Sequence, residues 1–273
     1  RDVFGTAWAA YALLDAPTRI RQEKWGIHYR LAFGLSWLTK KFELNDNYYN
    51  LAIGSHGNIY FLFSNSVFYQ INQNWRVFAK WGINHYSNGR VKAPNWGINT
   101  IKIGLGVKYK LQDNPTAEIP APPIYSKNRL QFILAGGIKE ETVLEPSTFG
   151  VGLASIDFLR FYKPFQHYSL GLGLFYDPTI RFLARDVNLP ATNSWNFRLG
   201  AQIGHGWFFG NYGIHVQAGY YLHSKFHHLG RLYTRITMQY RLTNGLWAHV
   251  ALKSHKIIAD YIEFGLNYGV NFN

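Results

Sequence analysis

The sequence contains no cysteine and few charged residues for its length. Only 16% of its 273 residues are Asp, Glu, Lys or Arg, whereas about a quarter is usual in soluble domains. Without cysteine there is no disulfide framework, thiol nucleophile or thiolate metal site. The chain also lacks an apolar run of about 18 residues, which excludes a transmembrane helix. Any passage of this chain through a membrane would therefore use strands.

Acidic residues are particularly scarce. The sequence has 15 Asp and Glu against 28 Lys and Arg, which gives a formal net charge of +13. A basic chain favours nucleic acid, anionic lipid or an acidic protein as partner. The basic residues are spread along the chain and accompany no nucleic-acid motif, so we expect no nucleic-acid partner. The chain opens at Arg1 without a signal-peptide pattern. We therefore expect a processed chain, or one that lacks its true beginning.

Aromatic residues and two-residue alternation are abundant instead. Aromatics reach 18%, and segments of ten or more residues alternate in polarity. In one of them Ile214, Val216 and Ala218 lie on one face, and His215 and Gln217 lie on the other. Soluble strands are usually about five or six residues long. Long strands with one apolar, aromatic-flanked face and one polar face are typical of a transmembrane β-barrel; a soluble β-sandwich is the alternative.

The alternation predicts thirteen strands in an all-β, antiparallel transmembrane β-barrel, with residues 1–273 forming a single outer-membrane domain. They are expected near 3–14, 23–39, 52–71, 74–87, 97–111, 127–139, 148–162, 166–181, 194–208, 212–224, 229–242, 245–256 and 259–272. Residues 112–126, rich in proline, are expected to form a long periplasmic connection. Single-chain barrels have an even number of strands and both ends inside. Since thirteen strands would place Arg1 outside, we expect at least one more before it and about fourteen in all; a miscounted strand is the alternative.

The segment from His85 to Asn99 is the candidate functional stretch. His85 and Ser87 lie two residues apart on one strand and therefore share a face. Two polar residues on one side of a strand ordinarily indicate only that this side faces water. Here, however, the apolar residues of both adjoining strands, such as Ile83 and Ile101, have odd residue numbers, as His85 and Ser87 do. His85, Ser87 and Asn99 should therefore face lipid at the extracellular end, where polar groups are costly unless they are used. Ser and His in this position could act as nucleophile and base on a lipid.

The same stretch resembles a known family. His85-Tyr86-Ser87-Asn88, followed after a short loop by Pro94-Asn95-Trp96-Gly97-Ile98, resembles the active-site signature of the outer-membrane lipid A deacylases, or acyloxyacyl hydrolases. The upstream residues 53–58 resemble a segment of the longer members. The resemblance covers roughly residues 5–110, and the C-terminal half is similar only as barrel wall. Because the small members have eight strands, the extra strands imply a larger barrel.

The resemblance implies roles for individual residues. His85 would be the general base and Ser87 the nucleophile, and the oxyanion would be stabilised by Asn88, Gly89 and Asn95. Asn99 departs from the pattern, which has Glu as the third member of the triad. An amide can still accept a hydrogen bond from the His ring, but it brings no negative charge to the imidazolium. A loss in rate of a few orders of magnitude is the expected consequence.

These observations favour an outer-membrane serine esterase that removes an ester-linked acyl chain from lipid A or a related outer-leaflet lipid. Arg90 and Lys92 would bind the phosphates of lipopolysaccharide, or are ordinary loop charges. One alternative is a catalytically weakened or inactive barrel that is a structural subunit of a complex with other outer-membrane or periplasmic proteins. Another is an anion-selective pore lined by basic lumen residues such as Arg235. We expect no cofactor and no metal, because the scattered histidines form no ligand set.

Overall fold

The computed structural model describes residues 2–111, 126–143, 147–227, 230–256 and 258–273. The chain divides into two compact units, residues 1–88 with 94–118, and residues 89–93 with 119–273. The elements of the described residues are β1 (Ala7–Arg21), β2 (Trp25–Leu38), β3 (Gly57–Gln70), β4 (Trp75–Ser87), β5 (Ile98–Tyr109), β6 (Asn128–Glu140), β7 (Thr148–Lys163), β8 (Gln166–Tyr176), α1 (Thr179–Asp186), the 3-10 helix η1 (Asn193–Asn196), β9 (Phe197–Phe209), β10 (Tyr212–His223), β11 (Leu232–Arg241), β12 (Leu246–His255) and β13 (Ile258–Phe272). Among these residues, no helix is long and apolar enough to span a membrane.

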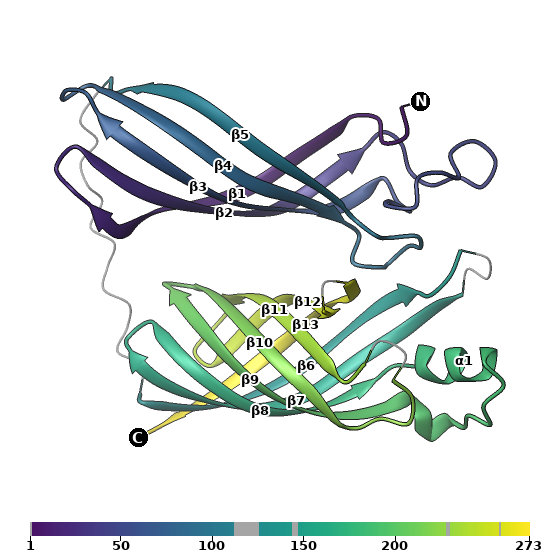
Figure 1. Ribbon diagram of the computed structural model, residues 1–273. Coiled ribbons are helices and arrows are strands. Elements are labelled where there is room, and N and C mark those ends of the chain that lie inside the picture. The colour runs from purple at the N-terminus through teal and green to yellow at the C-terminus, as the bar shows by residue number, and fades with distance from the viewer. Residues whose placement is uncertain (1, 112–125, 144–146, 228–229, 257) are drawn as a thin grey trace. The chain divides into compact units, whose positions relative to one another are not determined.

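The first unit is a curved, antiparallel sheet in the order β1-β2-β3-β4-β5 (Figure 1). Short turns join β1 to β2 and β3 to β4, whereas long connections, residues 39–56 and 88–97, leave the other end of the sheet. One face of β5 is apolar and open, since Ile103 and Leu105 are 84% and 86% exposed. The sheet therefore presents an uncovered apolar surface, and its long connections gather at one end of that surface.

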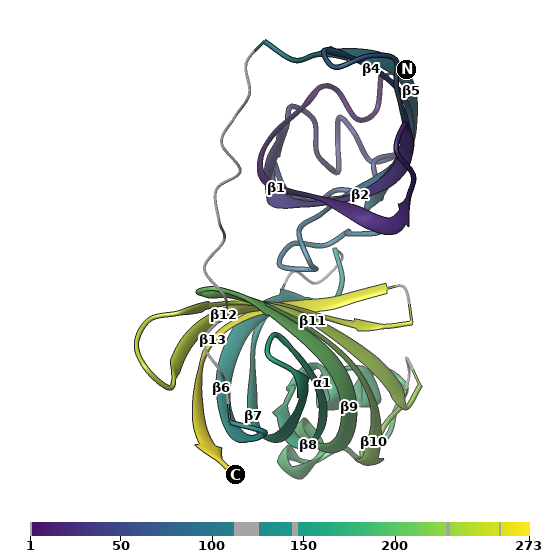
Figure 2. The same ribbon diagram turned by 90° about the vertical axis from the view of Figure 1, so that its left-hand side faces the viewer.

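The second unit is a closed barrel in which β6 to β13 follow one another and β13 pairs with β6 (Figure 2). The strands alternate as the sequence predicts: on β7, Ser155 and Asp157 are buried, whereas Ile156 and Phe158 are exposed. The outer surface of the barrel is thus apolar and its interior polar. The long connections again share one end, and α1 lies there, between β8 and β9 (Figure 1).

Paired charges fill the interior of the barrel. The Arg235 guanidinium donates to Gln217 Oε1 at 2.7 Å and to the carboxylate of Glu263. Nearer the α1 end, Lys139 Nζ donates to Asp177 Oδ2 at 3.0 Å and to Asp260 Oδ1 at 2.7 Å. All six of these side chains are almost completely buried. Each buried charge has an opposite charge or amide beside it, as the low dielectric of an interior requires.

The all-β fold and all thirteen expected strands are confirmed, but a barrel of about fourteen strands is not. Eight strands close a barrel by themselves, because β13 finds its partner in β6, and the other five form a separate sheet. The proline-rich connection expected at residues 112–126 lies outside the described residues except for Ser126. The eighth strand ends at Tyr176 rather than near residue 181, since Asp177-Pro178 leads directly into α1. An eight-residue helix is too short to leave a clear periodic signal.

Candidate active site

Strands β4 and β5 place His85 directly opposite Asn99. In this pair His85 Nδ1 lies 2.8 Å from Asn99 Oδ1. The neighbouring cross-strand pair on the same face is Ile83 with Ile101, which are 49% and 78% exposed. The two-residue alternation in the sequence thus predicted correctly that polar residues lie at the end of an otherwise apolar strand face. With the amide oxygen accepting from Nδ1–H, the imidazole keeps Nε2 available as a base.

The connection between β4 and β5 folds back over Ser87. Asn95 Nδ2 donates to Ser87 Oγ at 2.8 Å, and the backbone N–H of Asn88 donates to Asn95 Oδ1 at 3.0 Å. The second bond fixes which end of the Asn95 amide points at the serine. Ser87 is only 4% exposed as a result. The loop therefore provides a donor beside the hydroxyl that sequence analysis selected as the nucleophile.

Gly97 shapes the space around His85. Its φ of +76° lies in the left-handed region that favours glycine. A Cβ added there would lie 2.7 Å from His85 Cε1, closer than real Cβ contacts allow. Its backbone N–H donates to Ala52 O at 2.9 Å. Gly97 therefore lets the backbone approach the edge of the imidazole while it is tied to the neighbouring connection.

The connection between β2 and β3 supports the site from the side. Asn88 Nδ2 donates to Ser55 Oγ at 2.9 Å, and Ser55 Oγ donates to Gly57 O at 2.8 Å. His56 Nδ1 contacts Leu38 O at 2.7 Å, and its ring stacks on Trp37. Sequence analysis noted these residues only for their resemblance to longer family members and gave Ser55 no role. The only feature of the sequence that could have pointed to Ser55 was its position in that segment.

The middle of the β4–β5 connection, residues 89–93, belongs to the second unit. Gly89 opens it with a φ of +60°. Arg90 pairs with the carboxylate of Glu141 at 2.6 Å, and Lys92 pairs with that of Glu140 at 2.8 Å. Burial raises the pKa of Glu141, and the positive charges of Lys139 and Arg90 oppose that rise. The two basic side chains predicted to bind phosphate therefore each have a carboxylate partner, although Lys92 remains 49% exposed.

No metal-binding arrangement accompanies these residues. In the parts of the chain that the structure describes, no group of three or more His, Asp or Glu side chains could hold a metal ion. Two hydrogen-bonded pairs make up the candidate site, His85 with Asn99 and Ser87 with Asn95. Between them they offer a hydroxyl, an imidazole, a group that orients the imidazole and an amide donor, which are the groups that nucleophilic ester hydrolysis uses.

Comparisons with known proteins match both units. The family model described as lipid A 3-O-deacylase (PagL) matches residues 5–108. That of acyloxyacyl hydrolase, C-terminal domain, matches residues 128–272, more than half of the chain. The chain belongs to the acyloxyacyl hydrolase family. Apart from residues 89–93, the first match lies in the first unit, and the second match lies in the second unit. The closed barrel is therefore a part of the family's architecture and not an unrelated addition.

Other comparisons add little to this membership in the acyloxyacyl hydrolases. No curated protein matches the chain significantly. The similar solved structures include three mutants of a porin from Rh. blastica, each 8% identical, with 97% of this chain and 91% of the porin chain covered. Their TM-score is 0.22, so the likeness carries no argument about function.

Proposed function

We propose that this acyloxyacyl hydrolase is an outer-membrane serine esterase that removes an ester-linked acyl chain from lipid A or a related outer-leaflet lipid. The observation that carries the proposal is the pairing of His85 with Asn99 at the end of an exposed apolar stripe. A soluble substrate would not need a catalytic pair there. An acyl chain, in contrast, can lie along Ile83 and Ile101 while its ester group reaches Ser87.

In the proposed reaction Ser87 Oγ attacks the ester carbonyl, and His85 Nε2 takes the hydroxyl proton. Asn99 holds Nδ1–H and so keeps the ring in the tautomer that can act as base. The tetrahedral oxyanion accepts hydrogen bonds from Asn95 Nδ2 and the backbone N–H of Gly89, while the backbone of Asn88 orients the Asn95 amide. His85 returns the proton to the departing sugar oxygen. Water then hydrolyses the acyl-serine with the same base and releases the fatty acid.

The surface of both units supports a location in the outer membrane. Their outward strand faces are apolar, with exposed aromatic side chains such as Trp75 and Tyr109. Long connections are typical of the extracellular side of such proteins, which supports a position of the β4–β5 connection at the outer leaflet. Trp96 in this connection is 81% exposed, as suits a residue that rests in the interface between lipid and water.

We also propose that Arg90 and Lys92 meet the phosphates of the lipid. They lie only three and five residues after Ser87, and half of the Lys92 side chain is exposed. Their pairing with Glu141 and Glu140 would hold them in place between turnovers. Binding of phosphate there would have to compete with these carboxylates, so the contribution of the two residues is expected to appear in KM.

A structural role in a complex is the second candidate function. The observation that favours it is the form of the first unit, whose outermost strands β1 and β5 are the edges of an open sheet. Backbone groups at a sheet edge invite pairing with another strand. A native pull-down from mild detergent tests this role: stoichiometric co-purification of a further protein supports it, and isolation of the chain alone counts against it.

Mass spectrometry of lipid A tests the enzymatic proposal. Lipid A is isolated from cells that express the protein or its Ser87→Ala variant. Ser64→Ala, which changes another buried serine of the same sheet, is the matched control. We expect a lipid A species that lacks one acyl chain with the protein and the control, and none with Ser87→Ala. Identical acylation in all three samples contradicts the proposal.

A further inference from the structure

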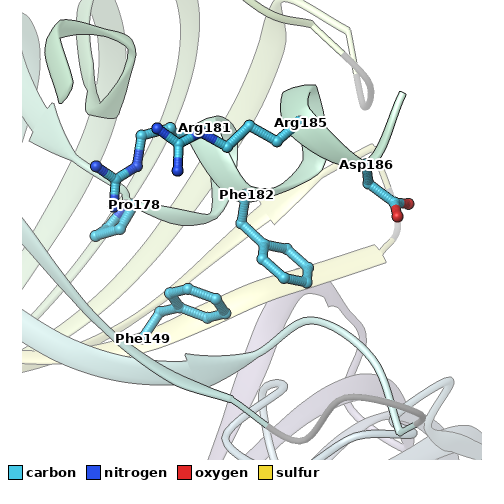
Figure 3. Close-up of a pocket in the computed structure, with 6 residues that line it drawn as sticks. All are labelled: Phe149, Pro178, Arg181, Phe182, Arg185 and Asp186. Atoms are coloured by element: carbon cyan, nitrogen blue, oxygen red, sulfur yellow. The ribbon is translucent and has the colours of Figure 1, made fainter. Parts of the chain in front are cut away.

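The α1 end of the second unit carries a pocket that the proposed reaction does not use. Its volume is about 290 Å³ (Figure 3). It is lined by Phe149 of β7 and by Pro178, Arg181, Phe182, Arg185 and Asp186. The last five recur at the three- and four-residue spacing that places side chains on one face of a helix. The opposite face of α1 is buried through Ile180 and Ala184. The helix thus turns a cationic and aromatic face outward.

The barrel holds this helix firmly. Asp177, at the end of β8, accepts hydrogen bonds at Oδ1 from Thr179 N at 3.2 Å and from Thr179 Oγ1 at 2.6 Å. Its other oxygen accepts from Lys139 at 3.0 Å and from Arg198. One carboxylate therefore links the first turn of α1 to two cations of the barrel interior. The pocket is pre-organised, since its helix is fixed to a rigid wall.

The two arginines of the pocket are oriented by neutral oxygens. Arg181 donates to Asn193 Oδ1, and Arg185 donates to Ala191 O from Nε at 3.3 Å and from Nη2 at 3.2 Å. Within the described residues, neither guanidinium has a carboxylate oxygen within 4.0 Å. Asp186 points away from both in Figure 3. Because a guanidinium has five N–H groups in a planar fork, each arginine keeps its charge and several donors for an anion.

The rest of the pocket is aromatic. The rings of Phe149 and Phe182 lie 5.2 Å apart between centroids, at an angle of 52°. They form an apolar wall beside the two cations, as Figure 3 shows. A bare inorganic anion would make no use of this wall. A phosphate ester on a sugar would use both parts, because guanidinium groups bind its oxygens in pairs and the aliphatic face of the sugar can pack on an aromatic ring.

We propose that this pocket binds the phosphorylated saccharide head group of an outer-leaflet glycolipid, at a place separate from Ser87. The proposal rests on the proposed function for its position at the outer surface, since α1 lies among the long connections. The pocket would then hold a lipopolysaccharide head group without cleaving it, because the pocket residues include no nucleophile and base pair.

The absence of cysteine allows a site-specific test. Val187, next to the pocket and 56% exposed, is changed to cysteine and labelled with an environment-sensitive fluorophore in the full-length Ser87→Ala protein in detergent micelles. The probe titrated is diphosphoryl lipid A. We expect saturable binding that weakens at least tenfold on Arg181→Gln with Arg185→Gln, and also on Phe182→Ala. Arg160→Gln, which changes an arginine held by the amide oxygen of Asn128, is the control and should bind as before.

Two results would overturn the proposal. One is equal affinity of the double arginine variant and the control. The other is displacement of lipid A by micromolar glucose 1-phosphate or inorganic phosphate, which would make the pocket a site for free phosphates. Folding of each variant is checked by its heat-dependent mobility in gels. Since this titration measures binding and not release of fatty acid, its failure is distinguishable from failure of the proposed esterase activity.

Discussion

His85 Nδ1 lies 2.8 Å from the Oδ1 of Asn99, its direct cross-strand partner. In the proposed reaction the amide orients the imidazole, but it cannot neutralise the imidazolium that would form when His85 takes the proton of Ser87. In serine hydrolases a buried carboxylate at this place stabilises that charge, and its replacement by an amide can cost about four orders of magnitude in kcat. The His85–Asn99 pair therefore has the orientation that the proposed mechanism needs, without the negative charge that would stabilise the imidazolium.

The first prediction is a gain of activity in Asn99→Glu. A carboxylate beside Nδ1 should stabilise the imidazolium and raise kcat by about 10- to 1,000-fold. Release of fatty acid from lipid A measures the change. Thr100→Glu, which adds the same charge to the neighbouring position on the opposite face, is the control. A kcat in Asn99→Glu no higher than that of the unchanged protein would show that Asn99 does not limit the reaction.

The second prediction concerns Gly97. In Gly97→Ala the new methyl group would lie 2.7 Å from His85 Cε1, and the φ of +76° adds backbone strain. Displacement of the imidazole by about 1 Å should lower kcat on the order of 100-fold with little effect on KM. Gly57→Ala is the control, since a Cβ there meets nothing within 4 Å. Equal kcat values for the two variants would contradict the role given to Gly97.

The third prediction separates binding from catalysis at Asn95. Asn95→Ala removes the donor to Ser87 Oγ, and with it one proposed contact to the oxyanion. Loss of one such donor costs about 100- to 1,000-fold in kcat. Asn47→Ala, in the other long connection of the same unit, is the control. A change confined to KM would assign Asn95 to substrate binding instead.

The fourth prediction concerns the acid stability of the second unit. Burial of Asp177 raises its pKa, but the charges of Lys139 and Arg198 outweigh burial and lower that pKa to about 2. A carboxyl whose pKa is lower when folded stabilises the fold above its unfolded pKa, about 3.9, and loses this contribution as the pH falls toward 2. Asp177→Asn should therefore lower the urea midpoint at pH 7. The midpoint of this variant should also fall less than that of the unchanged protein as the pH is lowered toward 2.

Asp186→Asn is the control for that experiment, because Asp186 is exposed. It should leave the urea midpoint close to that of the unchanged protein at every pH. Loss of one partner from a buried ion pair costs on the order of 3–5 kcal/mol, which is large enough to resolve. Parallel pH profiles for the Asp177 and Asp186 variants would show that the ion-pair cluster beneath α1 does not govern acid stability.

The sequence predicted the strands and the face of the site because alternation is a local signal. Odd residue numbers alone put His85, Asn99 and Ile101 on one face. The structure adds the register of β4 with β5, which sets His85 opposite Asn99. Barrel closure could not be predicted in this way. The pairing of β13 with β6 joins strands far apart in the sequence. Both strands alternate in polarity as any barrel strand does, so the alternation does not indicate which strand is the partner.

The supporting contacts of the site were equally hidden. The bond of Asn88 to Ser55 joins two irregular connections, whose shape depends on individual hydrogen bonds and not on periodicity. The carboxylates that pair with Arg90 and Lys92 lie about fifty residues further along the chain. A charge in a loop carries no local sign of its partner, so sequence analysis left these two residues open between phosphate binding and ordinary loop charges.

The most direct test of the account measures single and double variants of the proposed nucleophile and base. Purified Ser87→Ala, His85→Ala and the double variant are assayed for fatty acid release from lipid A in detergent micelles. Residues that act as one unit are strongly non-additive, so we predict that each single variant loses as much activity as the double variant. Ser87→Ala that releases fatty acid at the rate of the unchanged protein would contradict the central claim.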